Sequence, residues 1–143
     1  MRVSEVMTCD VETVSPNATL QEAAQSMARS DAGALPVVET GRLIGILTDR
    51  DIAIRAVGTG KDPANTLVRD IMSSEVQFTY AHDDVDDVAE VMADVQVRRM
   101  PVIDGDTNVV GIVSLADLAR EKRPRKVGEA LQAISRPGGQ HNA

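Results

Sequence analysis

The sequence has almost no aromatic side chains and only one cysteine. Phe78 and Tyr80 are the only aromatics of the Phe, Tyr and Trp class in 143 residues. Stacking platforms for single-stranded nucleic acid are therefore missing, and any core must be aliphatic. Cys9 alone can form no intramolecular disulfide and supplies no thiolate cluster for a structural metal. These scarcities exclude a disulfide-stabilised domain and a zinc ribbon.

Excess positive charge and long apolar runs are also missing. The net charge of −7 argues against nucleic acid as the main partner, because phosphate neutralisation needs a basic surface. No apolar run approaches the roughly 18–20 residues of a membrane span, and the N-terminus lacks the apolar core of a signal peptide. We therefore expect a cytoplasmic protein that binds neither nucleic acid nor a membrane. A basic cluster near the C-terminus is either a solvated helix end or a contact for an acidic partner; it comprises Arg120, Lys122, Arg123, Arg125 and Lys126.

What the sequence does contain is an internal repeat. Val3–Met7 aligns with Val68–Met72, and the same offset aligns Pro36-Val37 with Pro101-Val102. A repeat of this length is typical of a duplicated half-domain rather than a solenoid. Units of about 60 residues bury too small a core to be secure alone. We therefore expect an α+β domain in which two units pack through their sheets with pseudo-two-fold symmetry.

Each repeat has the pattern of a β-α-β-β-α unit. In the first, Thr19 and Glu22 have the spacing of a capping box before an amphipathic helix, and a hairpin turn follows at Glu39–Arg42. We divide the chain into repeat 1 with its linker (1–65), repeat 2 (66–123) and a tail (124–143). The tail is predicted to form a short amphipathic helix that covers its own domain or a second subunit. Its apolar stripe is Val127, Ala130, Leu131 and Ile134.

The stretch Gly45–Ile52 and its copy Gly111–Leu118 have the greatest functional interest. Each reads as an apolar strand end, a hydroxyl residue and an acid three positions later, at the start of a helix. One interpretation is a capping box, which stabilises a helix start by about 1 kcal/mol. The other is a polar binding site, because a carboxylate accepts two ribose hydroxyl bonds and the backbone N–H groups of a helix start favour anions. Both interpretations hold if the turn is a capping box in one ligand state and a binding site in another.

Together, the paired motifs Leu35-Pro36-Val37 with Gly45–Ile52, and Met100-Pro101-Val102 with Gly111–Leu118, resemble a tandem pair of CBS (cystathionine β-synthase) domains. The resemblance covers about residues 2–122. Within the family, the chain is most similar to stand-alone two-repeat actinobacterial proteins of the hypoxic-response type. The resemblance implies a regulatory, non-catalytic CBS pair that binds an adenine nucleotide or adenosyl compound in clefts between the repeats. AMP, ADP, ATP and S-adenosylmethionine are the expected regulatory ligands, and no cofactor is required.

The resemblance also implies roles for particular residues. Asp51 and Asp117 would contact ribose hydroxyls, and Thr48 and Ser114 would lie near phosphate. Basic residues before the Pro-Val strand would neutralise that phosphate; here these are Arg98 and Arg99, whose counterparts in the first repeat are Gly33 and Ala34.

The two clefts are therefore not equivalent. We expect the pseudo-two-fold to bring Arg98 and Arg99 towards the Thr48/Asp51 turn, where an arginine fork suits phosphate. The alternative is ion pairing with acids such as Asp94 or Asp49. Gly33 and Ala34 would leave room for an adenine ring, although Gly33 alternatively serves as a helix C-cap.

The remaining polar clusters give weaker signals. The acids Asp83, Asp84, Asp86 and Asp87 are explained by helix capping and the helix dipole, so we predict no metal site. We predict no catalytic residues. The leading hypothesis is a homodimeric, stress-related ligand sensor that acts on an unidentified protein partner. Its rival is a non-catalytic dimeric scaffold with empty clefts.

Overall fold

The computed structural model describes residues 1–121 and 124–137. The chain forms two compact units, and their boundaries cross those of the sequence repeats. The first unit consists of residues 12–76. The second unit combines residues 1–11 with the described residues from Gln77 onwards. The fold is α+β with two related units, which confirms the predicted fold class.

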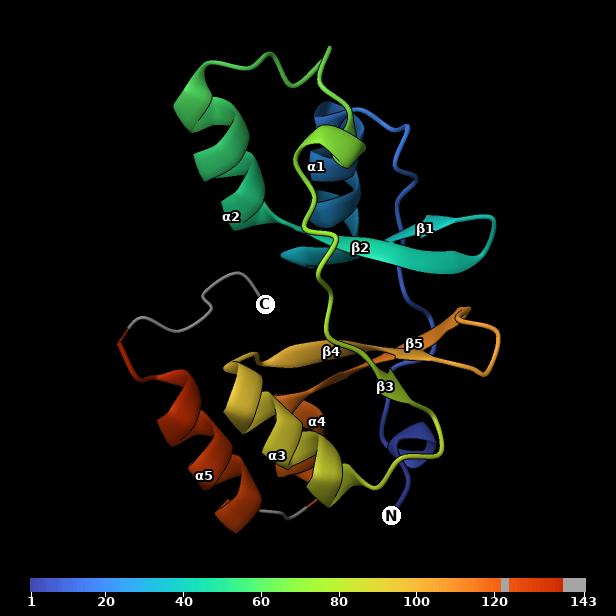
Figure 1. The fold of residues 1–143 in the computed structure, drawn as a ribbon, viewed down its shortest axis with the longest axis vertical. Helices are drawn as coiled ribbons and strands as arrows, with labels where there is room; N and C mark the ends of the chain where they lie inside the picture. Colours follow the sequence, from blue (N-terminus) through green and yellow to red (C-terminus); the bar gives the residue numbers. More distant parts are fainter. Residues whose placement is uncertain (122–123, 138–143) are drawn as a thin grey trace. The chain divides into compact units, whose positions relative to one another are not determined.

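The first unit consists of a β-hairpin with helices on one of its faces (Figure 1). Helix α1 (Leu20–Ser30) begins after Thr19, whose Oγ1 accepts a hydrogen bond from the Glu22 N–H at 3.1 Å. Strands β1 (Ala34–Glu39) and β2 (Arg42–Thr48) pair antiparallel. The predicted strand before α1 is reduced to a single parallel bridge between Val14 and Val37. The core of the unit is aliphatic and includes Leu20, Leu35, Leu47, Val68 and Ile71.

The helix after β2 is irregular. It begins at Asp49, inside the predicted stretch Gly45–Ile52, but the α-helical part, α2 (Asp49–Asp51), is short. A π-helical turn (Ile52–Ala56) and a 3₁₀ turn (Val57–Thr59) continue it. π-Helical turns are uncommon and often occur at functional sites. The sequence pattern does not predict this π-helical turn, because the apolar spacing also fits an ordinary α-helix.

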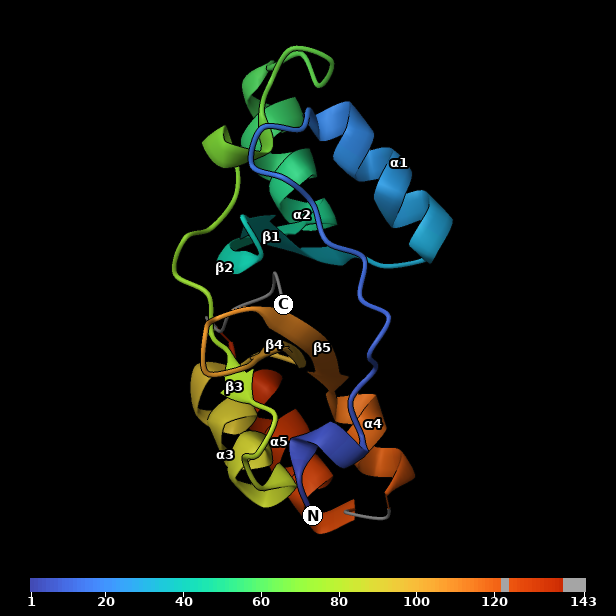
Figure 2. The same ribbon diagram turned by 90° about the vertical axis from the view of Figure 1, so that its right-hand side faces the viewer.

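The second unit has a three-stranded sheet in the order β3-β4-β5. Strand β3 (Thr79–Tyr80) is parallel to β4 (Arg99–Ile103), which is antiparallel to β5 (Val109–Ser114). Figures 1 and 2 show helices α3 (Val85–Val95), α4 (Leu115–Arg120) and α5 (Pro124–Ile134) on one face of this sheet. Between these helices and the sheet lies an aliphatic core that includes Val3, Val85, Met92, Met100 and Leu118.

Each unit is completed by the short segment that opens the other sequence repeat. The Thr8 and Ile112 backbones exchange two hydrogen bonds of 2.9 Å, and the Ile46 and Ser73 backbones do the same. Glycine makes both approaches possible: a Cβ at Gly45 would lie 2.7 Å from the Ser73 carbonyl oxygen, and one at Gly111 would lie 2.9 Å from that of Thr8. The predicted boundary at residues 65 and 66 follows the repeat in the sequence, whereas the compact units follow this exchange of segments.

The predicted amphipathic helix of the tail is α5, and it packs on its own unit. Ala130 and Ile134 are buried in the core of the second unit, while Leu131 lies on the exposed side. Gln96 Nε2 donates to the Ala133 carbonyl at 2.8 Å, and Lys126 Nζ donates to Glu90 Oε1 at 2.9 Å. Both bonds tie α5 to the α3 region. The residues of the tail beyond 137 lie outside the described part.

Candidate functional site

The first candidate turn joins β2 to α2. Thr48 Oγ1 accepts from the Asp51 N–H, and Asp51 Oδ2 accepts from the Thr48 N–H, both at 3.0 Å. The Asp51 side chain is only 5 % exposed although it stands at a helix start. The structure therefore confirms that Thr48 and Asp51 form a capping box. Because this bond uses Oδ2, the carboxylate retains acceptor capacity for a hydroxyl donor.

The second candidate turn, between β5 and α4, repeats this arrangement and adds a cation. Asp117 Oδ2 accepts from the Ser114 N–H at 2.8 Å, and Ser114 Oγ accepts from the Asp117 N–H at 3.2 Å. Asp117 is also 5 % exposed. Its other oxygen, Oδ1, is ion-paired with Arg120 Nη2. The two turns therefore share a capping box but differ in what occupies the second carboxylate oxygen.

Gly33 and Ala34 lie beside the first turn. Ala34 pairs with Thr48 across the hairpin, and the Gly33 carbonyl accepts from the Asp49 N–H at 2.9 Å. A Cβ at Gly33 would lie 2.9 Å from Asp49 Oδ2, so the glycine lets the Asp49 carboxylate approach the backbone. The alternative role of Gly33 as a helix C-cap is wrong, because Asp31 takes the left-handed position that ends α1, with φ of 52°.

Arg98 and Arg99 lie beside the second turn. Arg99 pairs with Ser114, and the Arg98 carbonyl accepts from the Leu115 N–H at 2.8 Å. Within the described part of the second unit, neither guanidinium forms the ion pair with Asp94 that we considered as an alternative. The expectation that both arginines approach the Thr48/Asp51 turn concerns two separate units and stays a prediction.

The acidic cluster before α3 serves local structure. Asp84 Oδ1 accepts from the Asp86 N–H at 2.8 Å at the start of the helix. Asp83 Oδ2 accepts from Thr79 Oγ1 at 2.7 Å and from the Tyr80 N–H at 2.8 Å. Across residues 1–121 and 124–137, no group of three or more His, Cys, Asp or Glu side chains is arranged to hold a metal ion. Nor does any helix in these ranges have the length and apolarity needed to cross a membrane.

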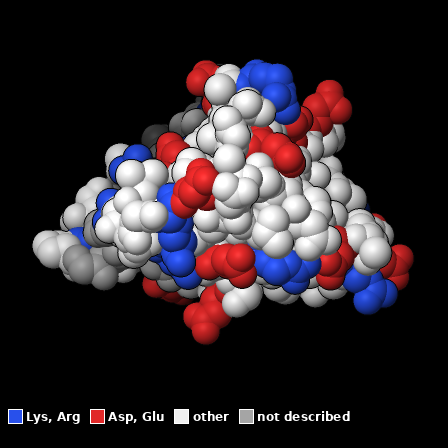
Figure 3. All heavy atoms as spheres, turned by 90° about the horizontal axis from the view of Figure 1, so that it is seen from above, with Lys and Arg blue, Asp and Glu red and all other residues white. Residues whose placement is uncertain are grey.

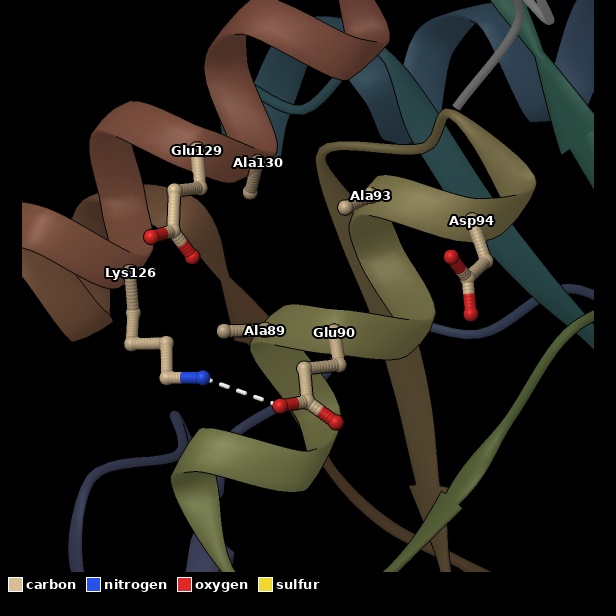
Figure 4. Close-up of a pocket in the computed structure, with 7 residues that line it drawn as sticks. All are labelled: Ala89, Glu90, Ala93, Asp94, Lys126, Glu129 and Ala130. Carbon is tan, nitrogen blue, oxygen red and sulfur yellow. Dashed lines mark hydrogen bonds and ion pairs between the residues drawn. The ribbon is translucent and has the colours of Figure 1, made fainter.

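The sequence did not predict a hollow between α3 and α5 (Figure 4). Its volume is about 170 Å³, and it is lined by Ala89, Glu90, Ala93, Asp94, Lys126, Glu129 and Ala130. Figure 4 shows Lys126 reaching across it to Glu90. This hydrogen bond, with the charge of Glu90, raises the pKa of Lys126. Pockets for small organic ligands usually measure roughly 300–1,000 Å³, so the hollow is a crevice between helices.

The surface charge is mixed on the face shown in Figure 3. Lys and Arg side chains lie among Asp and Glu side chains there, and no continuous basic area covers that face. Together with the net charge of −7, this arrangement gives a nucleic-acid backbone little to bind on that face.

Comparison with known proteins explains why the two turns repeat. The profile of the CBS domain matches the sequence twice, over residues 3–58 and 68–123. The chain belongs to the CBS domain family. The resemblance that we drew from the Pro-Val strands and the Gly-Ile-x-Thr/Ser-x-x-Asp motifs is thereby confirmed.

Two relatives are similar to this CBS pair over nearly their whole length. The CBS domain-containing protein YhcV of Bacillus subtilis is 46% identical over 134 residues, which cover 93% of this chain and 94% of the relative. Hypoxic response protein 1 of Mycobacterium tuberculosis is 36% identical over 134 residues, with 93% of each chain covered. Neither name states a catalytic activity.

Two solved structures extend the comparison to bound groups. The crystal structure of Hypoxic Response Protein I with two coordinated zinc ions has a TM-score of 0.77 and 37% identity; 84% of this chain and 98% of that chain are covered. The CBS domain pair of protein MJ0100, in complex with 5′-methylthioadenosine and S-adenosyl-L-methionine, has a TM-score of 0.76 and 29% identity. That match covers 87% of this chain and 98% of the other.

Proposed function

We propose that this CBS pair is a regulatory module that binds an adenine nucleotide or a related adenosyl compound, with no catalytic step of its own. The observation that carries the proposal is the buried carboxylate at the first turn. Asp51 is 5 % exposed, and its bond to the Thr48 N–H uses only Oδ2. A ribose hydroxyl is a suitable donor for the rest of its acceptor capacity. The adenosyl complex of the MJ0100 pair supports this choice of ligand class.

The energetics favour a role for Asp51 in affinity. A hydrogen bond to a charged group contributes roughly 1.5–3 kcal/mol, which corresponds to one to two powers of ten in affinity. The small residues Gly33 and Ala34 lie beside Thr48, and an adenine ring placed there would displace the Asp49 carboxylate that lies next to Gly33. Arg98 and Arg99 would supply positive charge for a phosphate. Ser114 and Asp117 form the second, related turn.

The proposal includes a cytoplasmic homodimer that passes the ligand signal to a protein partner. A ligand regulates such a module only if it binds one conformational or dimeric arrangement more tightly than another. A change in stability alone therefore demonstrates binding, and a change in assembly or partner affinity demonstrates regulation.

A second candidate function is a non-catalytic interaction scaffold that binds no nucleotide. The capping boxes favour it in one respect, because each buried carboxylate already accepts a backbone hydrogen bond without any ligand. Asp51 and Asp117 would then be structural residues whose loss weakens a helix start.

A thermal-shift screen with AMP, ADP, ATP, NAD and S-adenosylmethionine separates the two functions. A ligand at about 100 times its Kd stabilises the protein by about 2.7 kcal/mol. Asp51→Asn keeps an oxygen for the Thr48 N–H but replaces the other oxygen by a donor group, so the ligand-induced shift should largely disappear. Asp94→Asn, on the exposed side of α3, is the matched control and should keep the shift. If no compound raises the midpoint, the scaffold function is supported and the sensing function is rejected.

A further inference from the structure

We propose that Arg120 blocks the second turn, so that an adenosyl ligand binds tightly only at the Asp51 turn. The inference rests on the proposed function and concerns how the two related turns share it. It assigns a role to an arginine that lies outside the repeated motif.

The blocking contact and the capping box together engage both carboxylate oxygens of Asp117. Its Oδ2 accepts from the Ser114 N–H at 2.8 Å, and its Oδ1 is paired with the Arg120 guanidinium. The Asp117 side chain is 5 % exposed, whereas that of Arg120 is 68 % exposed. A surface arginine therefore reaches back, three residues along α4, onto a carboxylate that has little access to water. A ribose hydroxyl that approaches Asp117 must compete with this guanidinium for the carboxylate.

The first turn has no corresponding cation. The alignment that pairs Asp51 with Asp117 pairs Ile54 with Arg120, and Ile54 is a half-exposed aliphatic residue. The backbone also differs, because α2 ends at Asp51 and the chain continues as a π-helical turn. Within the described residues, Asp51 forms no ion pair. Its carboxylate is therefore the one that accepts a ligand hydroxyl without first losing a salt bridge.

The difference between the turns sets an order of affinity. Breaking the contact between Arg120 and Asp117 opposes binding at the second turn, while the capping box is present in both turns and cancels in the comparison. We expect removal of the guanidinium to tighten binding at the second turn about tenfold, the factor that corresponds to 1.4 kcal/mol.

The test uses isothermal titration calorimetry with 5′-methylthioadenosine as the probe. This compound carries both ribose hydroxyls but neither a phosphate nor a positive charge, so a liberated arginine gains no charged partner from it. Asp51→Asn in the full chain leaves only the second turn to bind. In that background, Arg120→Gln should lower the Kd about tenfold. The matched control is Arg125→Gln, which removes the same charge from a 91 % exposed side chain that pairs with Glu129; its Kd should stay unchanged.

The same titration of the otherwise unchanged protein should reveal one tight site, and Arg120→Gln should add a second. Equal affinities with and without Arg120 would overturn the blocking role and leave the adenosyl-binding function intact. If no variant binds 5′-methylthioadenosine, S-adenosylmethionine or AMP, the proposed function fails, and the role of Arg120 fails with it. Adding Asp117→Asn to Arg120→Gln should abolish the gained site; if the site persists, it is not the one assigned here.

Discussion

The two units use the same strand, turn and helix start but surround it differently. In the first unit, the Asp51 carboxylate lies next to a π-helical turn and has no cationic partner among the described residues. In the second, Asp117 is held by Arg120 on a regular helix. The capping box is common to both because it stabilises the helix start in either setting. The comparison indicates that both repeats keep the structural role of the motif, while the contacts of the second carboxylate oxygen differ.

The helices that precede the two hairpins, α1 and α3, also differ in how deeply they are buried. Ala24 of α1 is exposed, whereas its counterpart Ala89 in α3 is buried at 2 %. Helix α5 accounts for the difference, because it packs against α3, and among the described residues no such helix packs against α1 (Figure 1). The stability of the second unit should therefore depend on the C-terminal helix, and that of the first should not.

The largest expected effect comes from a substitution in α5 that tests whether the second unit depends on this helix. Ile134→Ala removes a side chain that is 5 % exposed in the core of the second unit, and we expect the free energy of unfolding to fall by about 2–5 kcal/mol. Urea unfolding measures the loss, and hydrogen exchange assigns it to amides of α3 rather than α1. Leu131→Ala, on the exposed side of the same helix, is the control and should change stability by less than about 0.5 kcal/mol. Equal losses from both substitutions would show that α5 is not anchored through Ile134.

A smaller effect is expected from substitutions at the contact between each hairpin and the segment that opens the other sequence repeat. Gly45→Ala places a Cβ 2.7 Å from the Ser73 carbonyl oxygen, a backbone atom that cannot move without opening the strand contact. Gly111→Ala meets first the flexible Met7 side chain and then the Thr8 carbonyl oxygen at 2.9 Å. We expect both substitutions to cost about 1–3 kcal/mol, with Gly45→Ala the more costly.

Gly105→Ala is the matched control for this pair, because nothing lies within 4 Å of the added Cβ. Its unfolding midpoint in urea should stay close to that of the unchanged protein. If Gly45→Ala behaves like Gly105→Ala, the exchanged segment yields easily and the close approach at Ser73 contributes little to the first unit.

The sequence predicted the local features better than the connections between segments. The capping boxes, both hairpins and the tail helix follow from spacing and turn residues that lie close together in the chain. The exchange of segments did not follow, because Val3–Met7 and Val68–Met72 have the same pattern and fit either hairpin equally well. Gly33 was the natural C-cap candidate on propensity, but Asp31 takes that position without a glycine. The contact between Arg120 and Asp117 has ordinary i, i+3 spacing, and only the buried position of Asp117 gives it significance.

The smallest expected effect sharpens the comparison at the two hairpin turns. The first turn is a tight two-residue loop in which Thr40 and Gly41 have positive φ angles of 51° and 85°. The second is longer and is organised by Asp104, which accepts from the N–H groups of Asp106 at 2.9 Å and Asn108 at 3.0 Å. The hydrogen bond from the Asn108 N–H is the main cause that holds the pKa of Asp104 below its ordinary value of 3.8. The second turn should therefore depend on the charge of Asp104.

Because the pKa of Asp104 is lowered in the folded protein, its stabilising contribution is present above pH 3.8 and is lost as the pH falls through the lower folded value. Asp104→Asn keeps one acceptor oxygen but removes the charge, so its turn should exchange amide hydrogen faster than that of the unchanged protein at neutral pH. The ratio of the Asn108 N–H exchange rates in the two proteins should shrink towards one between about pH 5 and about pH 2, while the Gly41 N–H in the first turn shows no such convergence. A ratio that stays constant across this range would mean that the geometry of the Asp104 side chain, rather than its charge, organises the longer turn.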